Sequence, residues 1–583
     1  MRTTEEIVEL YNQRRIAKGP LHDQMRRIRS LANGDIVVPL NELDRNSKAN
    51  IANLLVQGLD QMSMRVASTM PSPFFPPVKE GSERSKGYAY TRRQAMLSMW
   101  DQNKLKLKMR RRARHLLAYS QSAVVLKPNF RTFAPQWAVR NPLDTFAAPV
   151  DDPDDMLPDD CIFTYKTTAN WLLSNYGEQV LGTLRMGRVD SDSRYTMLEY
   201  VDGDAMQLIV MGAENSPGLS VAERAGIDSV MLEAVPNRTG RPLAIIANRI
   251  TLDKPRGQFD GTLGMYYTRA RLQALTEIAI ERGIFPEEYL VARTGENPEI
   301  LQLADSKAGV LGVVKGGDII SRDLNPGYKT YEAIDRLERQ ERLEGAIPAE
   351  FGGESASNIR TGRRGENILS ATVDFRVQEA QSIFEMSILE EDKTAIAIDK
   401  TYFGDVTKTF FMASRTNTTP ETYVPNKIWE TDFHYVSYSA AGSDVNSLII
   451  GLGQRLGTGL MSKESAREAD PLISDPDLEH DRIISEGVEA ALLSSIQAQA
   501  ADPNGPYQPD DLAYLTKQVV ELDTTLYEAV RRTQQRAQDR QATMVQAGAP
   551  ETMPGLSAPG MGMESPVIGG GQPSIEQLIA QLG

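Results

Sequence analysis

The sequence has very little cysteine and histidine, and it contains no long apolar run. Its 583 residues include one cysteine, Cys161, and four histidines that lie far apart. A single cysteine excludes an internal disulfide framework and is typical of a reducing compartment, and no histidine has metal-ligand spacing. The longest apolar candidate, residues 447–461, contains Arg455 and is too short to span a membrane. The N-terminus is charged where a signal peptide needs an apolar region.

The motifs of several common enzyme classes are also missing. The sequence has no phosphate-binding Gly-x-x-x-x-Gly-Lys-[Ser/Thr], no His-Glu-x-x-His and no Gly-x-Ser-x-Gly. The glycines Gly451, Gly453 and Gly457 are one residue away from a dinucleotide-binding fingerprint, but they lie inside a helical pattern with no strand immediately before it. Close helix packing is therefore the preferred interpretation of these glycines. We expect no catalytic site, no cofactor and no metal ion.

Charge is distributed unevenly along the chain. The net charge is −14, yet residues 1–150 hold 25 Lys and Arg against 12 Asp and Glu, and the remainder holds 39 against 66. An acidic majority argues against a protein that coats DNA, because tight phosphate binding needs clustered cations. It is compatible with a passage along which DNA slides without adhering. The plainer interpretation is that acidic surfaces aid solubility.

Two local charge clusters have both a functional and a structural interpretation. The basic run Lys104, Lys106, Lys108, Arg110, Arg111, Arg112 and Arg114 could contact phosphate. No aromatic residue interleaves with this run to stack bases, so a solvated helix face or an ion-pair surface between subunits is favoured. The acidic run Asp151, Asp152, Asp154, Asp155, Asp159 and Asp160 is broken by two prolines and lacks the glycine of a calcium loop. A solvated acidic loop is favoured there.

The hydrophobic pattern predicts an α+β protein that is mainly helical. Asp202-Gly203 predicts a hairpin, Gly19-Pro20 a break between two helices, and Ser462 a helix N-cap. Predicted helices cover residues 3–18, 20–32, 46–70, 86–118, 263–282, 328–344, 366–402, 443–460, 475–500 and 510–543. Predicted strands cover residues 123–127, 161–166, 197–201, 205–211, 243–247, 310–314, 407–414 and 429–438.

The segment near the C-terminus has coiled-coil spacing and is followed by a tail of low complexity. Residues 546–583 are rich in Gly, Pro, Met and Ser and are predicted to be a flexible tail. The 3,4 spacing before it predicts about three heptads whose apolar stripe one subunit cannot easily bury. The stripe consists of Leu512, Leu515, Val519, Leu522, Leu526, Ala529 and Thr533.

Residues 345–365 form a predicted loop between a charged helix and a very long helix. The loop is rich in Gly and small residues, and it carries Asn358, Arg360, Arg363 and Arg364 near its end. A structureless connection of roughly twenty residues between helices is usually functional. We expect it to line a channel for nucleic acid. In the alternative interpretation these arginines pair with nearby glutamates and only order the loop, and the glutamates are Glu350, Glu354 and Glu366.

The order of these parts resembles that of the portal proteins of tailed bacteriophages. The resemblance covers residues 40–545 and is carried by several stretches. These are residues 50–60 (NIANLLVQGLD), residues 141–146 (NPLDTF) with the Asp/Pro run after them, residues 459–468 (GLMSKESARE) and residues 475–482 (DPDLEHDR). These stretches are similar in general character to sequences of the family, but none of them is a diagnostic signature of it.

The resemblance implies a portal-type architecture and assigns a role to each part. It implies an α/β wing, a helical stem, a small mixed α/β clip, a tunnel loop and a helical crown. In residue numbers, the wing is 1–262 with 366–500, the stem 263–283 with 328–344, the clip 284–327, the tunnel loop 345–365 and the crown 501–545. Because the clip is too short for a core of its own, its strands are expected to pair between neighbouring subunits.

The resemblance also implies a function and a set of partners. Subunits of that family form a dodecameric ring at one capsid vertex, through which DNA is packaged and ejected. Double-stranded DNA would slide past Asn358, Arg360, Arg363 and Arg364 without sequence preference. The other implied partners are the major capsid protein, the terminase large subunit and later the head–tail adaptor, in the host cytoplasm during assembly and at the head–tail junction of the virion. The clip residues expected at the docking face are Glu287, Glu288, Lys307 and Lys315.

Two other classes of function remain open from the sequence. One is a nucleic-acid-processing enzyme that uses the basic segment 104–114, which would need clustered carboxylates for two metal ions. The other is a capsid scaffold or adaptor without DNA contact. Ring size and an open axial hole distinguish these classes from a portal.

Overall fold

The described residues form two compact units, which are treated separately. The computed structural model describes residues 1–547 except 36, 41–44, 49, 80–81, 178–193, 214–228, 253, 285–286, 293–294, 296–298, 303–312, 316, 323–326, 346–361, 414–417, 439–444, 471–472, 474–475, 502–506 and 521–525. The first unit is Met1–Ser474 and the second begins at Asp475. Taken together, their described elements agree with the predicted fold class, a mainly helical α+β protein. The predicted flexible tail lies outside the described residues.

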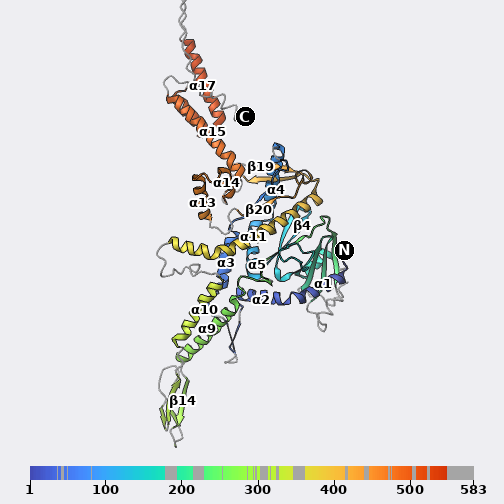
Figure 1. The fold of residues 1–583 in the computed structure, drawn as a ribbon, viewed down its shortest axis with the longest axis vertical. Helices are drawn as coiled ribbons and strands as arrows, with labels where there is room; N and C mark the ends of the chain where they lie inside the picture. Colours follow the sequence, from blue (N-terminus) through green and yellow to red (C-terminus); the bar gives the residue numbers. More distant parts are fainter. Residues whose placement is uncertain are drawn as a thin grey trace, which may run out of the picture. The chain divides into compact units, whose positions relative to one another are not determined.

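The first unit contains helices and several small antiparallel sheets (Figure 1). Its described helices are α1 (Thr4–Ala17), α2 (Gly19–Asn33), α3 (Leu54–Ser68), α4 (Glu83–Gln102), α5 (Leu105–Tyr119), the 3-10 turn η2 (Pro142–Asp144), α6 (Ala169–Tyr176), α9 (Thr262–Ile284), α10 (Tyr328–Gly345), α11 (Gly362–Phe403), α12 (Pro425–Ile428), α13 (Val445–Gly457) and α14 (Lys463–Ala469). Its described strands are β1 (Val37–Leu40), β2 (Arg45–Lys48), β3 (Ser72–Phe74), β4 (Gln121–Asn129), β5 (Ala134–Arg140), β6 (Thr145–Ala147), β7 (Asp160–Thr168), β8 (Arg194–Asp202), β9 (Ala205–Ala213), β10 (Val230–Pro236), β11 (Ala244–Asn248), β12 (Ile250–Thr251), β13 (Lys254–Pro255), β14 (Glu287–Ala292), β15 (Glu299–Gln302), β16 (Val313–Lys315), β17 (Gly317–Arg322), β18 (Lys408–Ala413), β19 (Thr418–Tyr423) and β20 (Tyr435–Ser437).

The two N-terminal helices agree with the prediction. The Thr3 side chain accepts a hydrogen bond from the Glu6 N–H, while the Glu6 carboxylate accepts one from the Thr3 N–H, so a capping box begins α1. The break between α1 and α2 falls at Lys18, directly before Gly19-Pro20, because proline is tolerated only in the first turn of the second helix. Tyr11 packs edge-on against Phe146, which fixes α1 on the strand β6.

Two long predicted helices are interrupted in the structure. The predicted helix 46–70 was wrong in its first part, because β2 pairs with β1 and the helix α3 begins only after the N-cap Asn53. The predicted helix 86–118 is two helices, α4 and α5. Between them the Asn103 side chain donates to the Pro135 carbonyl and accepts from the Trp137 N–H, and Lys104 adopts a left-handed φ of 53°. These tertiary hydrogen bonds hold the chain in a break that helical periodicity does not reveal.

Two antiparallel sheets form the β-rich part of the first unit. The larger has the strand order β10-β9-β8-β7-β6 and the smaller β11-β4-β5. Five predicted strands correspond to β4, β7, β8, β9 and β11, whereas β5, β6 and β10 were missed. The predicted hairpin at Asp202-Gly203 is confirmed: the Asp202 carboxylate accepts hydrogen bonds from the N–H groups of Asp204 and Ala205 at 2.8 and 2.5 Å.

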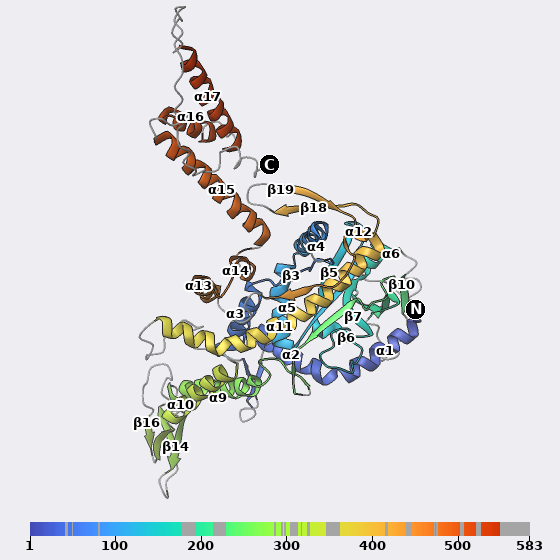
Figure 2. The ribbon, with the colours of Figure 1, turned by 45° about the horizontal axis from the view of Figure 1, so that its top comes forward.

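The helix α11 is the central element of the first unit. It contacts α3, α5, the strands β4, β5, β11 and β20, and the short helix α12 (Figures 1 and 2). Its buried residues Phe384, Ile388 and Ile398 belong to the main hydrophobic core, which also contains Trp137 and Trp429. Burying such side chains from several elements against one helix stabilises the unit by about 1.5–3 kcal/mol per large side chain.

The region after α11 differs in part from the prediction. The predicted strand 407–414 corresponds to β18, which pairs with the unpredicted β19. The predicted strand 429–438 is reduced to β20, which pairs with β3, because Trp429 is buried and donates its ring N–H to Asp399. The N-cap Ser462 at the start of α14 is confirmed.

The glycine pattern of α13 does not mediate packing within the described part of the chain. A β-carbon added at Gly451, Gly453 or Gly457 would meet no described atom within 4 Å. The preferred interpretation from the sequence, close helix packing, is therefore wrong for these glycines as far as the described residues extend.

The second unit is helical, and the stripe residues whose side chains are described, Leu512, Leu515, Ala529 and Thr533, are buried or half-buried within it. Its described helices are α15 (Pro476–Ala501), α16 (Pro509–Val520) and α17 (Leu526–Ala547). The predicted helix 510–543 is therefore two helices, which contact each other, and the core of the unit combines Leu492 and Ile496 with Leu515 and Val530. An ion pair between Arg540 and the buried Asp511 joins α17 to α16. The argument that this stripe needs a second subunit is thus not supported.

Candidate channel and docking regions

The helices α9 and α10 pack against each other and are joined by a buried cation. The Arg269 side chain is 3% exposed, and its Nε donates to Glu341 Oε2 at 2.8 Å. Its Nη1 lies 3.5 Å from Glu338 and its Nη2 donates to the Ala52 carbonyl at 3.1 Å. Burial raises the pKa of Glu341, and the Arg269 charge opposes this effect. One arginine therefore fixes both helices to the loop before α3.

Four short strands connect α9 to α10, and β14 lies beyond the ends of these helices (Figures 1 and 2). The strand β14 pairs with β17, and β15 pairs with β16. All four strands have a partner within their own chain, so pairing between subunits is not required to form them. The predicted pairing between neighbouring subunits therefore stays a prediction.

Three of the four predicted docking residues lie on these strands. Glu287 is opposite Arg322 in the register, and Glu288 is opposite Ser321. Lys315 is opposite Glu299. The fourth residue, Lys307, lies outside the described residues.

The predicted channel loop is shorter than the sequence indicates. The helix α10 ends at Gly345 and α11 begins at Gly362, so Arg363 and Arg364 belong to the first turn of α11. Arginine is a good helix former, and the single Gly365 costs only about 1 kcal/mol within a helix. The expected loop ending at residue 365 was therefore wrong at its C-terminal side. Asn358 and Arg360 lie outside the described residues, together with Glu350 and Glu354.

The C-terminal end of α10, where the connection to α11 begins, accepts hydrogen bonds from side chains of other segments. Both terminal nitrogens of Arg376 donate to the Glu344 carbonyl at 3.1 Å, and Gln258 Nε2 donates to the Gly345 carbonyl at 2.9 Å. A cation at a helix C-terminus also interacts favourably with the helix dipole. From Arg376 back to Gly362, α11 extends for about 21 Å at 1.5 Å per residue. Figures 1 and 2 show this end of α11, in yellow, lying away from the sheets.

Part of the basic run in α5 is used inside the fold. Arg112 is fully buried and forms an ion pair with Glu391 of α11. Lys108 Nζ donates to the Trp137 carbonyl at 2.5 Å, Arg111 Nη2 donates to the Val139 carbonyl at 2.6 Å, and Arg114 pairs with an aspartate of α3. Lys104, Lys106 and Arg110 are exposed, and Arg111 is also exposed although it makes this hydrogen bond. The favoured interpretation as a solvated face therefore holds for only part of the run.

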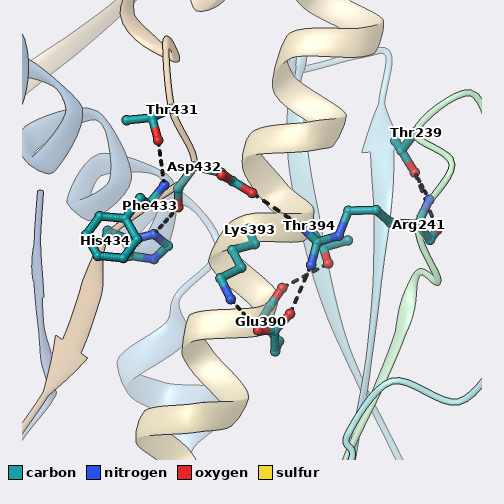
Figure 3. Close-up of polar contacts among 9 residues, drawn as sticks. All are labelled: Thr239, Arg241, Glu390, Lys393, Thr394, Thr431, Asp432, Phe433 and His434. Carbon is teal, nitrogen blue, oxygen red and sulfur yellow. Dashed lines mark hydrogen bonds and ion pairs between the residues drawn. The ribbon is translucent and has the colours of Figure 1, made fainter. Parts of the chain in front are cut away.

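A polar network links α11 to two other segments of the first unit (Figure 3). Arg241 Nη2 lies 2.9 Å from Glu390 of α11, and its Nη1 lies 3.5 Å from Asp432. The Asp432 carbonyl is 2.7 Å from Nδ1 of His434, so this nitrogen carries a proton. Lys393 Nζ is also 2.5 Å from Glu390. Arg241 and Lys393 are paired with the carboxylates of Glu390 and Asp432, so the network holds these segments against α11.

The helix α11 also has buried carboxylates, Asp392 and Asp399, whose hydrogen-bond and ion-pair partners lie on other elements. Asp392 accepts a hydrogen bond from the Trp100 ring at 2.8 Å, and its second oxygen lies 3.6 Å from Nε2 of His434. Burial raises the pKa of Asp392 to about 6. Asp399 pairs with Lys408 and accepts from Trp429. The sequence offers no local signal for these pairs, because the partners are distant along the chain.

The acidic loop does not assemble a cation site. Its last residue, Asp160, is buried and forms ion pairs with Arg2 and Arg14, whereas Asp151, Asp152, Asp154 and Asp155 are exposed. Within the described ranges, no three His, Cys, Asp or Glu side chains form a group that could hold a metal ion. The neighbouring Cys161 is buried, which raises the pKa of its thiol to about 12.

No protein-family model and no curated protein matches this chain. The functional argument therefore depends on the order and contacts of the elements above. None of the described helices is long and apolar enough to cross a membrane.

Proposed function

We propose that this chain is the subunit of a portal-type ring, a channel through which double-stranded DNA enters and leaves a capsid. The observation that carries the proposal is the arrangement of α9, the four short strands, α10 and α11. A helix pair bears a small β-element at its far end and leads, through residues 346–361, into a helix of 42 residues that is packed in an α/β body. This corresponds to stem, clip, tunnel loop and wing in the portal-type architecture.

The stem interpretation is supported by how firmly the helix pair is attached. Arg269 binds Glu341 and Glu338 in α10 and the Ala52 carbonyl before α3. The buried side of this junction excludes water, so the ion pair is screened weakly. A stem held in this way transmits movement of the clip to the wing. The clip would bind the terminase large subunit during packaging and the head–tail adaptor afterwards.

The channel interpretation depends on Arg360, Arg363 and Arg364. In a ring, each arginine is repeated once per subunit, so a few cations per chain form a dense belt facing phosphate. The acidic remainder of the chain would repel DNA elsewhere, which suits sliding better than tight binding. Contacts in a wet channel are screened within about 8–10 Å, so the effect should depend on salt.

Contacts between subunits require apolar surface that the single chain leaves exposed. Since the described members of the C-terminal stripe lie within the core of the second unit, other residues are candidates. Phe375 of α11 is 79% exposed, and Ile450 of α13 is 62% exposed. A closed ring needs heterologous contacts, in which one such surface meets a different surface of the next copy. In the virion, the ring would contact the major capsid protein at the head–tail junction.

Light scattering and negative-stain imaging of the purified full chain test the assembly. The expected result is a closed ring with an axial hole, a dodecamer by resemblance. Monomer at micromolar concentration, together with no ring in capsids assembled in the presence of the chain, would refute the proposal. A solid particle without a hole would instead support the scaffold or adaptor alternative.

Deletion of residues 290–320 tests the clip. We expect rings to form, because the interface surfaces on α11 and α13 are retained, and we expect DNA packaging to be lost. Packaging that continues normally would show that motor docking takes place elsewhere.

Replacing Arg360, Arg363 and Arg364 by alanine tests the channel belt. The length or retention of packaged DNA should change in a salt-dependent way while rings still form. A matched variant removes three exposed cations of α5 and should leave DNA content unchanged. The control substitutions are Lys104→Ala, Lys106→Ala and Arg110→Ala. Equal effects of both triple variants would mean that net charge, and not the channel belt, governs DNA retention.

The enzyme alternative finds no support among the described residues. Two-metal catalysis needs clustered carboxylates, and no group of the kind is present within the described ranges. The basic segment of α5 also binds its own fold through Arg112, Lys108 and Arg111.

A further inference from the structure

A cleft of about 370 Å³ lies between α5, the end of β5, η2 and β7 in the first unit. This volume is within the range of small-ligand sites, about 300–1,000 Å³. One face of α5 contributes residues four apart, and the opposite wall comes from the sheets. The side chains that matter here are Arg111, His115, Tyr119, Arg140, Asp144 and Tyr165.

Two arginines on opposite walls are held in place by the protein. Arg111 donates one N–H to the Val139 carbonyl at 2.6 Å, which leaves most of its five N–H groups available to a ligand. Arg140 pairs with Glu199, and its guanidinium lies 5.7 and 5.8 Å from the ring centres of Phe163 and Tyr165. Such fixed guanidinium groups match the geometry of a phosphate and lose little entropy on binding it.

His115, one turn after Arg111, has an unsatisfied nitrogen. Its Nδ1 is buried and has no hydrogen-bond partner within the described part of the chain. Burial, together with the positive charges of Arg111 and Arg112, lowers the pKa of His115 to about 4. The imidazole is therefore neutral at pH 7, and its N–H can donate to an anion. A nearby phosphate would satisfy this group and offset the excess positive charge.

The rest of the cleft has the groups that bind a nucleobase. The rings of Tyr119 and Tyr165 line it, and each aromatic ring that stacks on a base contributes about 1–3 kcal/mol. The Asp144 carboxylate is held by the Asn141 amide at 2.9 Å and can accept hydrogen bonds from ring or amino N–H groups of a base. The cleft thus combines phosphate-binding cations, aromatic surface and a hydrogen-bond acceptor.

We propose that this cleft binds one nucleotide unit, with its phosphate at Arg111, Arg140 and His115 and its base between the tyrosines and Asp144. The ligand chemistry is a nucleoside phosphate, either a free nucleotide or one unit of a single-stranded nucleic acid. This site is remote in sequence from the channel arginines, and it does not depend on ring formation.

Binding to the purified full chain tests the site with defined probes. Calorimetry is performed with adenosine 5′-monophosphate and with inorganic phosphate, and fluorescence anisotropy with a labelled ten-nucleotide single strand. We expect the nucleotide to bind more tightly than inorganic phosphate. If the nucleotide displaces the strand, the site takes single-stranded nucleic acid, and if only the nucleotide binds, the source is a free nucleotide. Absence of binding by both, or inorganic phosphate binding as tightly as the nucleotide, would overturn the proposal.

Matched variants of α5 locate the binding. Arg111→Gln should weaken nucleotide binding about tenfold to a hundredfold, because a charge-assisted contact is lost. Arg110→Gln removes the same charge from the adjacent position, which does not line the cleft, and should change affinity less than about twofold, as expected for an exposed charge. Tyr165→Phe should bind better than Tyr165→Ala, since only the latter removes the ring. Circular dichroism verifies that each variant is folded, and equal losses for the two arginine variants would refute the site.

Discussion

The buried ion pair between Arg112 and Glu391 allows a quantitative test of how α5 is held against α11. Both side chains are fully buried. Arg112 Nη1 donates to Glu391 Oε2 at 3.0 Å, its Nη2 contacts the other carboxylate oxygen, and the same Nη2 donates to the Ser387 hydroxyl at 3.0 Å. Its guanidinium also lies 5.1 Å from the Phe384 ring centre. The perturbation is Arg112→Met, which keeps most of the apolar volume.

The expected loss follows from what remains after the substitution. Glu391 becomes a buried carboxylate without a counter-charge, and breaking such a pair costs about 3–5 kcal/mol of unfolding free energy. Replacing both partners, as in Arg112→Met with Glu391→Leu, removes the uncompensated charge and should recover most of that loss. The coupling energy between the two positions should then exceed about 2 kcal/mol. The exposed pair of Arg114 and Asp60 provides the control, since such pairs contribute about 0.2–1 kcal/mol.

Urea unfolding followed by tryptophan fluorescence is the appropriate assay. All four tryptophans lie in the first unit, so the signal reports the unit that contains the ion pair. If Arg112→Met costs no more than Arg114→Met, or the double variant is no more stable than the single one, the reasoning is refuted. In that case water must reach Glu391 once the guanidinium is removed.

Two further predictions concern single buried positions. Burial raises the pKa of Asp392 to about 6, above the roughly 3.9 of an unfolded chain, so its contribution to stability is full below about pH 4 and is lost as the pH rises through 6. Asp392→Asn should therefore reduce the pH dependence of the urea midpoint between pH 4 and 6, and an unchanged slope would contradict this assignment. Asn103→Ala should lower the unfolding free energy by about 1–3 kcal/mol, because the Trp137 N–H loses its partner at the break between α4 and α5. A change below about 0.5 kcal/mol in fluorescence-monitored unfolding would show that the break forms without this side chain.

Local sequence signals predicted those elements whose causes are themselves local. The predicted turn at Asp202-Gly203 and the predicted N-cap Ser462 each depend on residues within four positions of one another. Long periodic segments such as α9, α10 and α11 were predicted for the same reason. The errors at Asn103 and Asn53 share one cause: both side chains hydrogen bond to carbonyl groups distant in the chain.

Some features of the candidate functional positions were likewise predictable from the sequence, and others were not. The order of elements around Gly345 and Gly362 was apparent from sequence, although the helix α11 begins earlier than expected. The pairing of Glu287 with Arg322 and of Lys315 with Glu299 was not, because strand register depends on which strands meet. The basic run that contains Arg111 was apparent from the sequence, but the cleft was not, since its walls come from segments about twenty residues apart.

The sequence by itself determined the fold class, many of the helices and strands, and the uneven charge, because propensity, periodicity and composition act over a few residues. Only the tertiary structure decided which charges are buried. Arg112 and Arg110 are two positions apart in one basic run, yet one is fully buried against Glu391 and the other is exposed. Adjacent positions on a helix face different directions, and the neighbour that each meets is set by packing between distant segments.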